Sequence, residues 1–165
     1  MTDQPEVAPG HWPQGEAEIE TMIDHGDLER VAPSTEHADL LMSHADEHLE
    51  AAKLMLDTHP TSAFPLIYDA ARKALTATLA KQGLRPHARS EIGAHKATQQ
   101  AVQAQLGRAA GVVRPFGPMR LRRHDTEYPS VGDAPITAGE TRQALEDATG
   151  IVAAMKKLLP RLGPF

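Results

Sequence analysis

The spacing of apolar residues along the chain predicts long amphipathic helices. Between residues 35 and 58, apolar side chains recur every three to four positions and therefore share one helix face: Ala38, Leu41, Ala45, Leu49, Ala52 and Leu56. A second stripe runs to about residue 159, through Leu145, Ala148, Ile151, Val152, Met155 and either Leu158 or Leu159. Each stripe predicts a helix that buries one side.

Two further helices are expected over residues 62–82 and 91–109. In the first, Pro65 falls in the opening turn, where a missing N–H costs little. Gly83 suits a left-handed C-cap, and Pro86 prevents the helix from resuming. The close-packing positions of this helix are small: Ala70, Ala71, Ala74 and Ala77.

Capping signals and breakers place the remaining boundaries. Ser34 or Thr35 is a good N-cap for the helix that follows. Thr137 and Glu140 form the capping box "TAGE" at the start of the C-terminal helix. A loop is expected over residues 110–118, and a short basic helix over residues 117–127, before Pro129.

These elements predict an all-α protein, an up-and-down bundle of four to five main helices over residues 34–159. Residues 1–33 form an acidic tail that can include a short helix, and residues 160–165 form a short tail. Few stretches are rich in β-branched and aromatic residues, so no sheet is expected. The apolar faces exceed what a small bundle needs internally, which favours a homodimer.

Composition narrows the class of protein. The chain has no cysteine, which excludes disulfides, thiolate catalysis and cysteine-ligated zinc. The N-terminus lacks the basic start and apolar run of a signal peptide. No apolar run approaches the roughly 20 residues of a membrane span. A cytoplasmic protein without a membrane partner is expected.

The net charge of −5 hides an asymmetry along the chain. Residues 1–60 carry fourteen acids and two bases, whereas residues 61–165 carry eight acids and fifteen bases. Residues 72–123 hold eleven bases and one acid, Glu91. Such a block can meet nucleic acid or nucleotide phosphates. Alternatively, acidic helices of the same chain or of a partner subunit neutralise it.

Histidines offer two candidate sites. His44 and His48 lie in "HADEH", which matches the zinc-peptidase pattern H-x-x-E-H, and His37 falls on the same helix face. The alternatives there are an adventitious divalent ion or a polar helix shoulder, and no metal or cofactor is assigned. His95 lies near a helix start, after Arg85 and Arg89, and either helps to hold an anion or packs and caps the helix.

The segment "MRLRRHDTEYP", residues 119–129, concentrates charge. Arg120, His124 and Glu127 share one helix face, and Arg123 lies four residues before Glu127. One interpretation is an intrahelical Arg–Glu network on a solvated face. In the other, Arg122 and Arg123 bind phosphate, while His124 or Tyr128 handles a proton or holds the phosphate in place.

Four runs of sequence resemble the HEPN superfamily, and most of all a branch seen in actinobacterial proteins. They are "LIYDAARKALTATLAKQGLRP", "GAHKATQQAVQAQL", "RPFGPMRLRRHDTEYP" and the helix opened by "ITAGE". The resemblance covers about residues 35–159. It implies a helical bundle that dimerises and binds nucleotides or RNA. Many HEPN proteins are metal-independent ribonucleases of toxin–antitoxin or defence systems, often paired with a nucleotidyltransferase.

The resemblance also assigns roles within the charged segment. Arg123 matches the motif arginine, His124 stands where this branch usually has Asn, and Tyr128 stands where a ribonuclease carries histidine. A phenol is a poor general base at neutral pH. The adjacent His124 points about 100° away from Arg123 on a helix. The match therefore supports the fold better than it supports cleavage.

The expected function has two versions. The first is a HEPN-type protein that interacts with nucleotides or RNA, with Arg123 and His124 as the catalytic pair if it is a metal-independent endoribonuclease. The residues expected to line the site and bind phosphate or nucleic acid are Arg120, Arg122, Glu127, Tyr128 and His95. The second is a non-catalytic dimeric helical scaffold or antitoxin-like interaction protein. A weaker third is a metal-binding bundle built on His37, His44 and His48.

Overall fold

The computed structural model describes residues 10–87 and 91–165, and these residues are mostly helical. In this part of the chain the α-helices are α1 (Glu16–Asp24), α2 (Thr35–Met55), α3 (Pro60–Gln82), α4 (Glu91–Leu106), α5 (Phe116–Glu127) and α6 (Ala138–Leu158). Two 3-10 helices, η1 (Gly107–Val113) and η2 (Leu159–Arg161), and two short strands, β1 (Leu28–Arg30) and β2 (Leu84–Pro86), complete it. The all-α prediction is confirmed.

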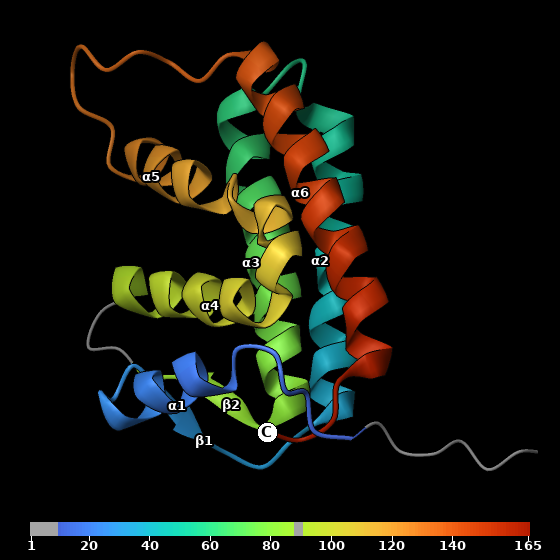
Figure 1. Cartoon of the computed structure of the whole chain (residues 1–165). Helices are drawn as coiled ribbons and strands as arrows, with labels where there is room; N and C mark the ends of the chain where they lie inside the picture. The colour runs from blue at the N-terminus through green and yellow to red at the C-terminus, as the bar shows by residue number, and fades with distance from the viewer. Residues whose placement is uncertain (1–9, 88–90) are drawn as a thin grey trace, which may run out of the picture.

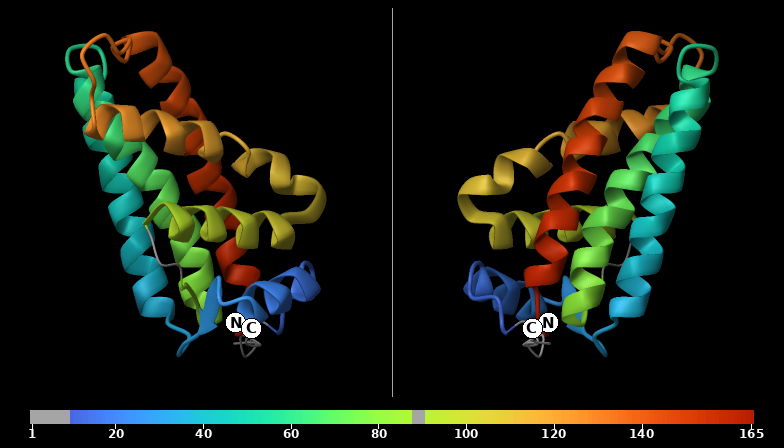
Figure 2. Two further views of the ribbon diagram at one scale, coloured as in Figure 1. Left: turned by 90° about the vertical axis from the view of Figure 1, so that its left-hand side faces the viewer. Right: turned by 90° about the vertical axis from the view of Figure 1, so that its right-hand side faces the viewer.

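The long helices α2, α3 and α6 lie side by side, and α3 is the central one (Figure 1). It also contacts α4 and α5, which project together from one side of this layer and cross α3 steeply (Figure 2). The basic residues from Lys96 to Arg123 thus lie on a separate layer of α4, η1 and α5, whereas Arg72, Lys73 and Lys81 of the basic block lie on α3 in the three-helix core.

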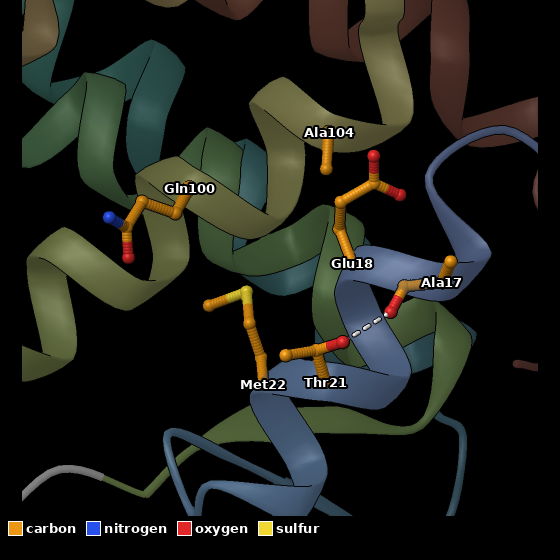
Figure 3. A pocket seen from close by; sticks show the side chains of 6 residues that line it. All are labelled: Ala17, Glu18, Thr21, Met22, Gln100 and Ala104. Carbon is orange, nitrogen blue, oxygen red and sulfur yellow. Dashed lines mark hydrogen bonds between the residues drawn. The ribbon is translucent and has the colours of Figure 1, made fainter.

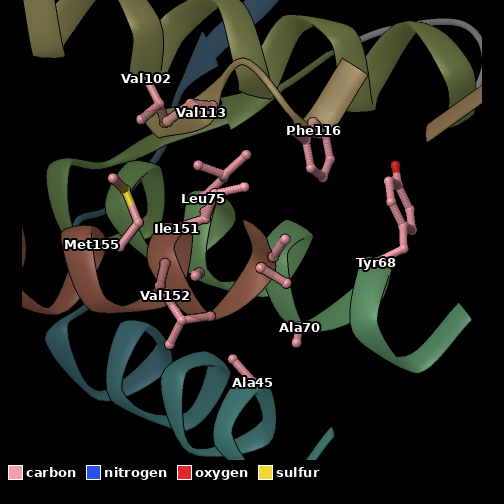
Figure 4. Packing of buried hydrophobic residues seen from close by; sticks show 14 of the residues in the cluster. Ala45, Tyr68, Ala70, Leu75, Val102, Val113, Phe116, Ile151, Val152 and Met155 are labelled. Carbon is pink, nitrogen blue, oxygen red and sulfur yellow. The ribbon is translucent and has the colours of Figure 1, made fainter. Parts of the chain in front are cut away.

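Small side chains on α3 let its neighbours approach closely. The four alanines predicted as close-packing positions, Ala70, Ala71, Ala74 and Ala77, are fully buried. Ala45 of α2 and Val152 of α6 are buried in the same cluster (Figure 4). Larger rings fill the space where α3 meets α5, since Tyr68 and Phe116 are both buried. The core therefore changes from small to aromatic side chains towards the basic layer.

The predicted helix caps are confirmed. The Ser34 side chain accepts a hydrogen bond of 3.0 Å from the backbone N–H of His37. Thr137 and Glu140 make both bonds of the capping box at the start of α6. Gly83 ends α3 with a φ of 77°, and a Cβ there would lie 2.6 Å from the carbonyl oxygen of Val31. Glycine is required at this position by conformation and by space.

Some predicted boundaries differ from the structure. Helix α3 begins at Pro60, so this proline occupies the first turn, and Pro65 lies further inside the helix. The loop expected over residues 110–118 is wrong in part, because η1 occupies residues 107–113 and α5 begins at Phe116. Val113 and Phe116 are fully buried. Their burial orders a segment that carries no regular apolar period of its own.

A two-stranded antiparallel ribbon was not predicted. Leu28 of β1 pairs with Pro86 of β2, and Arg30 pairs with Leu84. Each strand has three residues, which is too short to display an alternating pattern in sequence. The ribbon continues beyond the strands through a bond of 2.8 Å from the N–H of Val31 to the carbonyl of Gly83.

The described parts of both predicted tails pack against the bundle. Near the N-terminus, Ile19 and Leu28 are buried, and the indole N–H of Trp12 donates to the carbonyl of Gln105 over 3.0 Å. At the C-terminus, Leu162 is buried, and the N–H of Phe165 donates to the carbonyl of Gln82 over 2.9 Å. Both segments contribute to the core beyond the predicted limits at residues 34 and 159. Among the described helices, none has the length and apolarity that crossing a bilayer requires.

Candidate functional site

The charged segment forms helix α5, close to the predicted range. Its first turns are anchored by Phe116 and Met119, which are buried. The following cations, Arg120, Arg122 and Arg123, are half-buried, whereas His124, Glu127 and Tyr128 are exposed. The predicted site residues therefore divide into an inner group of arginines and an outer group at the end of the helix.

Arg122 is a structural connector between α5 and α6. Its Nε lies 3.0 Å from Oε1 of Glu140, and its Nη2 donates to the carbonyls of Ala134 and Pro135 over 3.1 and 3.2 Å. Asp125 lies 3.5 Å from its Nη1. The hydrogen bond with Glu140 is the main cause that raises the pKa of Arg122 above its ordinary value. This guanidinium is occupied within the chain, so the phosphate contact predicted for it is not supported.

Arg123 faces inwards. Its Nη2 lies 2.6 Å from Oε1 of Glu127, one turn later, and its guanidinium lies over the ring of Tyr68 at 5.2 Å from the centroid. The intrahelical Arg–Glu pair proposed from the sequence is therefore present. Cation–π contact with a buried ring adds to it.

Tyr68 is the residue at which three helices meet. It lies on α3 with no exposed surface, stacks on Phe116 of α5 at 5.0 Å, and places its hydroxyl 2.7 Å from Nδ1 of His95 on α4. The predicted site residues Arg123 and His95 thus contact the same ring. Sequence reasoning missed Tyr68. The available signal was a lone phenol among small apolar residues in "LIYDAARKAL", since a buried tyrosine needs a hydrogen-bond partner.

His124 does not take part in the contact between Arg123 and Tyr68. Its ring lies 5.0 Å from the ring of Tyr128, tilted by 42°, at the exposed end of α5. Arg123 contacts buried Tyr68, whereas His124 contacts exposed Tyr128. The two residues predicted as a catalytic pair therefore take part in separate contacts on the helix.

The histidine stripe of α2 meets α3 at Asp69. Nε2 of His48 lies 3.1 Å from Oδ2 of Asp69, which also pairs with Arg72 and Lys73. Burial opposes ionisation of Asp69, but hydrogen bonds from Lys73 and Arg72 outweigh it and hold its pKa below the ordinary value. Burial and then the charge of Lys73 lower the pKa of His48. Within residues 10–87 and 91–165, no group of three metal-binding side chains is assembled.

The layer of α4, η1 and α5 carries cations that lack acidic partners. No Asp or Glu occurs between Ile92 and His124. We call this layer the basic hairpin. Within it, Nε2 of Gln99 on α4 donates to the carbonyl of Val113, the last residue of η1, over 3.4 Å. Four of its cations make no ion pair with any described residue: Lys96, Arg108, Arg114 and Arg120.

Arg120 adds a buried donor to the basic hairpin. Its Nε is buried and has no hydrogen-bond partner in the described part of the chain. A buried N–H without a partner is costly and is usually satisfied by water or a ligand. Arg120 therefore differs from Arg122, whose guanidinium is bonded within the chain.

The predicted proximity of Arg85 and His95 is present in the structure. Both residues line a cavity of about 290 Å³ between α2, α3, β2 and α4. Arg89, the other arginine of that prediction, lies outside the described residues. Arg72 and His37 also line this cavity and were not predicted to join His95.

Two other hollows are lined by fewer cationic side chains. One, of about 400 Å³, lies beside Phe64 and Met119 and is bordered by the Arg122–Glu140 pair. The other, of about 530 Å³, lies between α1 and α4 (Figure 3). There the hydroxyl of Thr21 donates to the carbonyl of Ala17, and Glu18 is the charged residue of the lining. An acidic lining repels phosphate, so the α1–α4 hollow does not extend the basic surface.

The chain matches no protein-family model, no curated protein and no solved structure. The resemblance to HEPN proteins stays a prediction, and the proposals below rest on the residues of this chain.

Proposed function

We propose that this protein is a HEPN-like module that binds the phosphate groups of RNA or nucleotides and does not cleave RNA. The observation that carries the proposal is the basic hairpin, in which Lys96, Arg108, Arg114 and Arg120 have no acidic partner among the described residues. Cations that lack acidic partners can bind phosphates by releasing counterions. The resemblance adds the setting of a toxin–antitoxin or defence system with a nucleotidyltransferase-type partner.

Two contacts support binding without cleavage. Arg123, the residue that would stabilise phosphate charge, is paired with Glu127 and lies over Tyr68. His124, the remaining candidate base, contacts Tyr128 at the helix end. Acid–base catalysis of phosphodiester cleavage needs both groups positioned on one substrate. Arg123 and His124 are not joined in that way.

Binding is tested with a fluorescent single-stranded RNA followed by anisotropy over a range of KCl concentrations. The expected result is a linear fall of log K with log salt, and a slope reduced by about one for each phosphate-contacting cation removed. Lys96→Gln and Arg114→Gln should each weaken binding. Lys156→Gln on α6, whose cation pairs with Asp46, is the matched control. Equal weakening in all three variants, or salt-independent binding, contradicts the proposal.

Cleavage is tested separately, by incubating the protein with RNA in the presence and absence of EDTA. No product is expected in either case. Cleavage that persists in EDTA and disappears in Arg123→Ala would instead establish a metal-independent ribonuclease. This outcome would leave phosphate binding intact and overturn only the non-catalytic part of the proposal.

A second candidate is a dimeric scaffold or antitoxin-like interaction protein. The observation that favours it is the exposure of three apolar side chains on α5 and in the segment that follows it: Leu121, Tyr128 and Val131. A homodimer through this surface should dissociate in Leu121→Asp and persist in Leu54→Asp, which changes an exposed leucine on α2. Sedimentation of the two variants measures the difference. A dimer that binds no RNA favours this candidate.

A further inference from the structure

The cavity beside His95 differs in its lining from the other hollows. It lies where the start of α2, the second half of α3, the strand β2 and the first turns of α4 come together. Its volume of about 290 Å³ is at the lower end of the range for small-molecule sites. A polymer such as RNA does not fit inside, but a compact organic molecule does.

The walls of this cavity divide into an apolar part and a cationic part. Val31, Leu84 and Pro86 supply aliphatic surface. Arg72 and Arg85 supply two guanidinium groups, and each pairs with a carboxylate that does not line the cavity. Arg72 pairs with Asp69, and the Nε of Arg85 donates to Oε1 of Glu29 over 2.6 Å. Predominantly apolar walls with a few convergent polar groups are typical of sites that bind small organic ligands.

Among the described residues, Glu29 balances Arg85, whereas the charge of Arg72 is balanced only in part. Arg72 shares the single carboxylate of Asp69 with Lys73, so two cations are held by one anion. The side chain of Arg72 is 28% exposed and that of Lys73 is 15% exposed. In such a partly desolvated place an excess positive charge attracts an anion more strongly than it does in water. The Nε of Arg72 bonds to Asp69 over 2.7 Å, which fixes the guanidinium in position.

Polar groups from two further elements face the same space. The Ser34 oxygen accepts the N–H of His37, and its own proton has no acceptor among the described residues. His95 contributes its ring from α4, oriented by the bond from Nδ1 to the hydroxyl of Tyr68. A hydroxyl donor is suited to an anionic head group.

We propose that this cavity binds a small organic anion, with one carboxylate or phosphate head held chiefly by Arg72, beside the Glu29-paired Arg85, and a compact apolar body against Val31 and Leu84. The ligand is a free small molecule rather than part of a nucleic acid. The site is separate from the exposed cations of the basic hairpin, and the inference does not rest on RNA binding.

The test follows amide shifts of ¹⁵N-labelled protein during titration with phenyl phosphate, benzoate and neutral benzyl alcohol. The two anions share the apolar ring and differ in the head group, so their relative affinities identify the preferred head. The expected shifts lie around residues 34–37, 72–76, 84–86 and 94–98, and benzyl alcohol should bind much more weakly. Equal binding of the neutral compound overturns the proposal, as does the absence of shifts at millimolar ligand.

Variants locate the site. Arg72→Gln should weaken binding of the preferred anion about tenfold to a hundredfold, because it removes a charged hydrogen-bond donor. Arg85→Gln, at an exposed position on β2, gives the same direction of change if Arg72→Gln does not fold. Arg142→Gln is the control, since this arginine pairs with Asp57 and does not line the cavity. If the amide shifts appear instead around Lys96, Arg108 and Arg114, the anion binds to the basic hairpin, and the proposal of a cavity site is overturned.

Discussion

The hydroxyl of Tyr68 lies 2.7 Å from Nδ1 of His95, at a point where no solvent reaches the tyrosine. This contact joins α3 to α4. The same ring stacks on Phe116 and lies under the guanidinium of Arg123, which joins α3 to α5. One buried phenol therefore fixes the basic hairpin on the three-helix core.

Removal of that hydroxyl should loosen the hairpin. Tyr68→Phe keeps the ring and its stacking but leaves the buried side of His95 without the phenol, so we expect a loss of about 1–2 kcal/mol in the free energy of unfolding. Urea denaturation measures it. A double-mutant cycle with His95→Ala should show positive coupling between the two residues. Additive effects would mean that the 2.7 Å contact contributes no specific stabilisation.

Arg122 should control the order of the loop that follows α5. Its guanidinium bonds to the carbonyls of Ala134 and Pro135 and to Glu140, so Arg122→Ala should raise hydrogen exchange in residues 129–137. The global loss should stay near or below about 1 kcal/mol, because the pair is partly exposed. Arg122→Lys should not restore protection, since an ammonium cannot reproduce the planar fork. Unchanged exchange in both variants would contradict this role.

Asp69 should make stability depend on pH in the acid range. Its folded-state pKa lies below the ordinary 3.8, so its contribution is present above that value and is lost as pH falls through the lowered pKa. Asp69→Asn should destabilise the protein by about 2 kcal/mol at neutral pH, because Arg72 and Lys73 lose their shared partner. The variant should also lose stability less steeply in acid. Denaturation at a series of pH values measures both effects, with exposed Asp39→Asn as the control.

Two glycines should respond in opposite directions to alanine. Gly83→Ala should destabilise by at least about 2 kcal/mol, because the residue has a φ of 77° and its new Cβ would overlap the carbonyl of Val31. Gly150→Ala should stabilise by about 0.5–1 kcal/mol, since this glycine is inside α6 and no atom lies within 4 Å of the added methyl. Thermal unfolding compares the two. A shift of the same sign would contradict the backbone assignment at one of them.

The local features of the fold were predictable because their causes are local. The spacing of apolar residues predicted the helices, and the cap hydrogen bonds at Ser34, Gly83 and Thr137 involve neighbours within four residues. The pairing of Arg123 with Glu127 follows from one helical turn. The segment η1 and the ribbon of β1 and β2 could not be predicted in this way. Their order depends on burial and on partners more than 50 residues away.

The sequence by itself determined a helical chain with a basic middle and located the charged segment on one short helix. Only the tertiary structure decided which of its cations are paired with distant parts of the chain. Arg122 is paired with Glu140, 18 residues later. The Nε of Arg120, in contrast, is buried and has no hydrogen-bond partner among the described residues. The physical reason is that the sequence gives the number and order of the charged residues, whereas the pairing of two charges depends on the distance between them in the folded chain. That distance is set by the packing of α5 against α3 and α6.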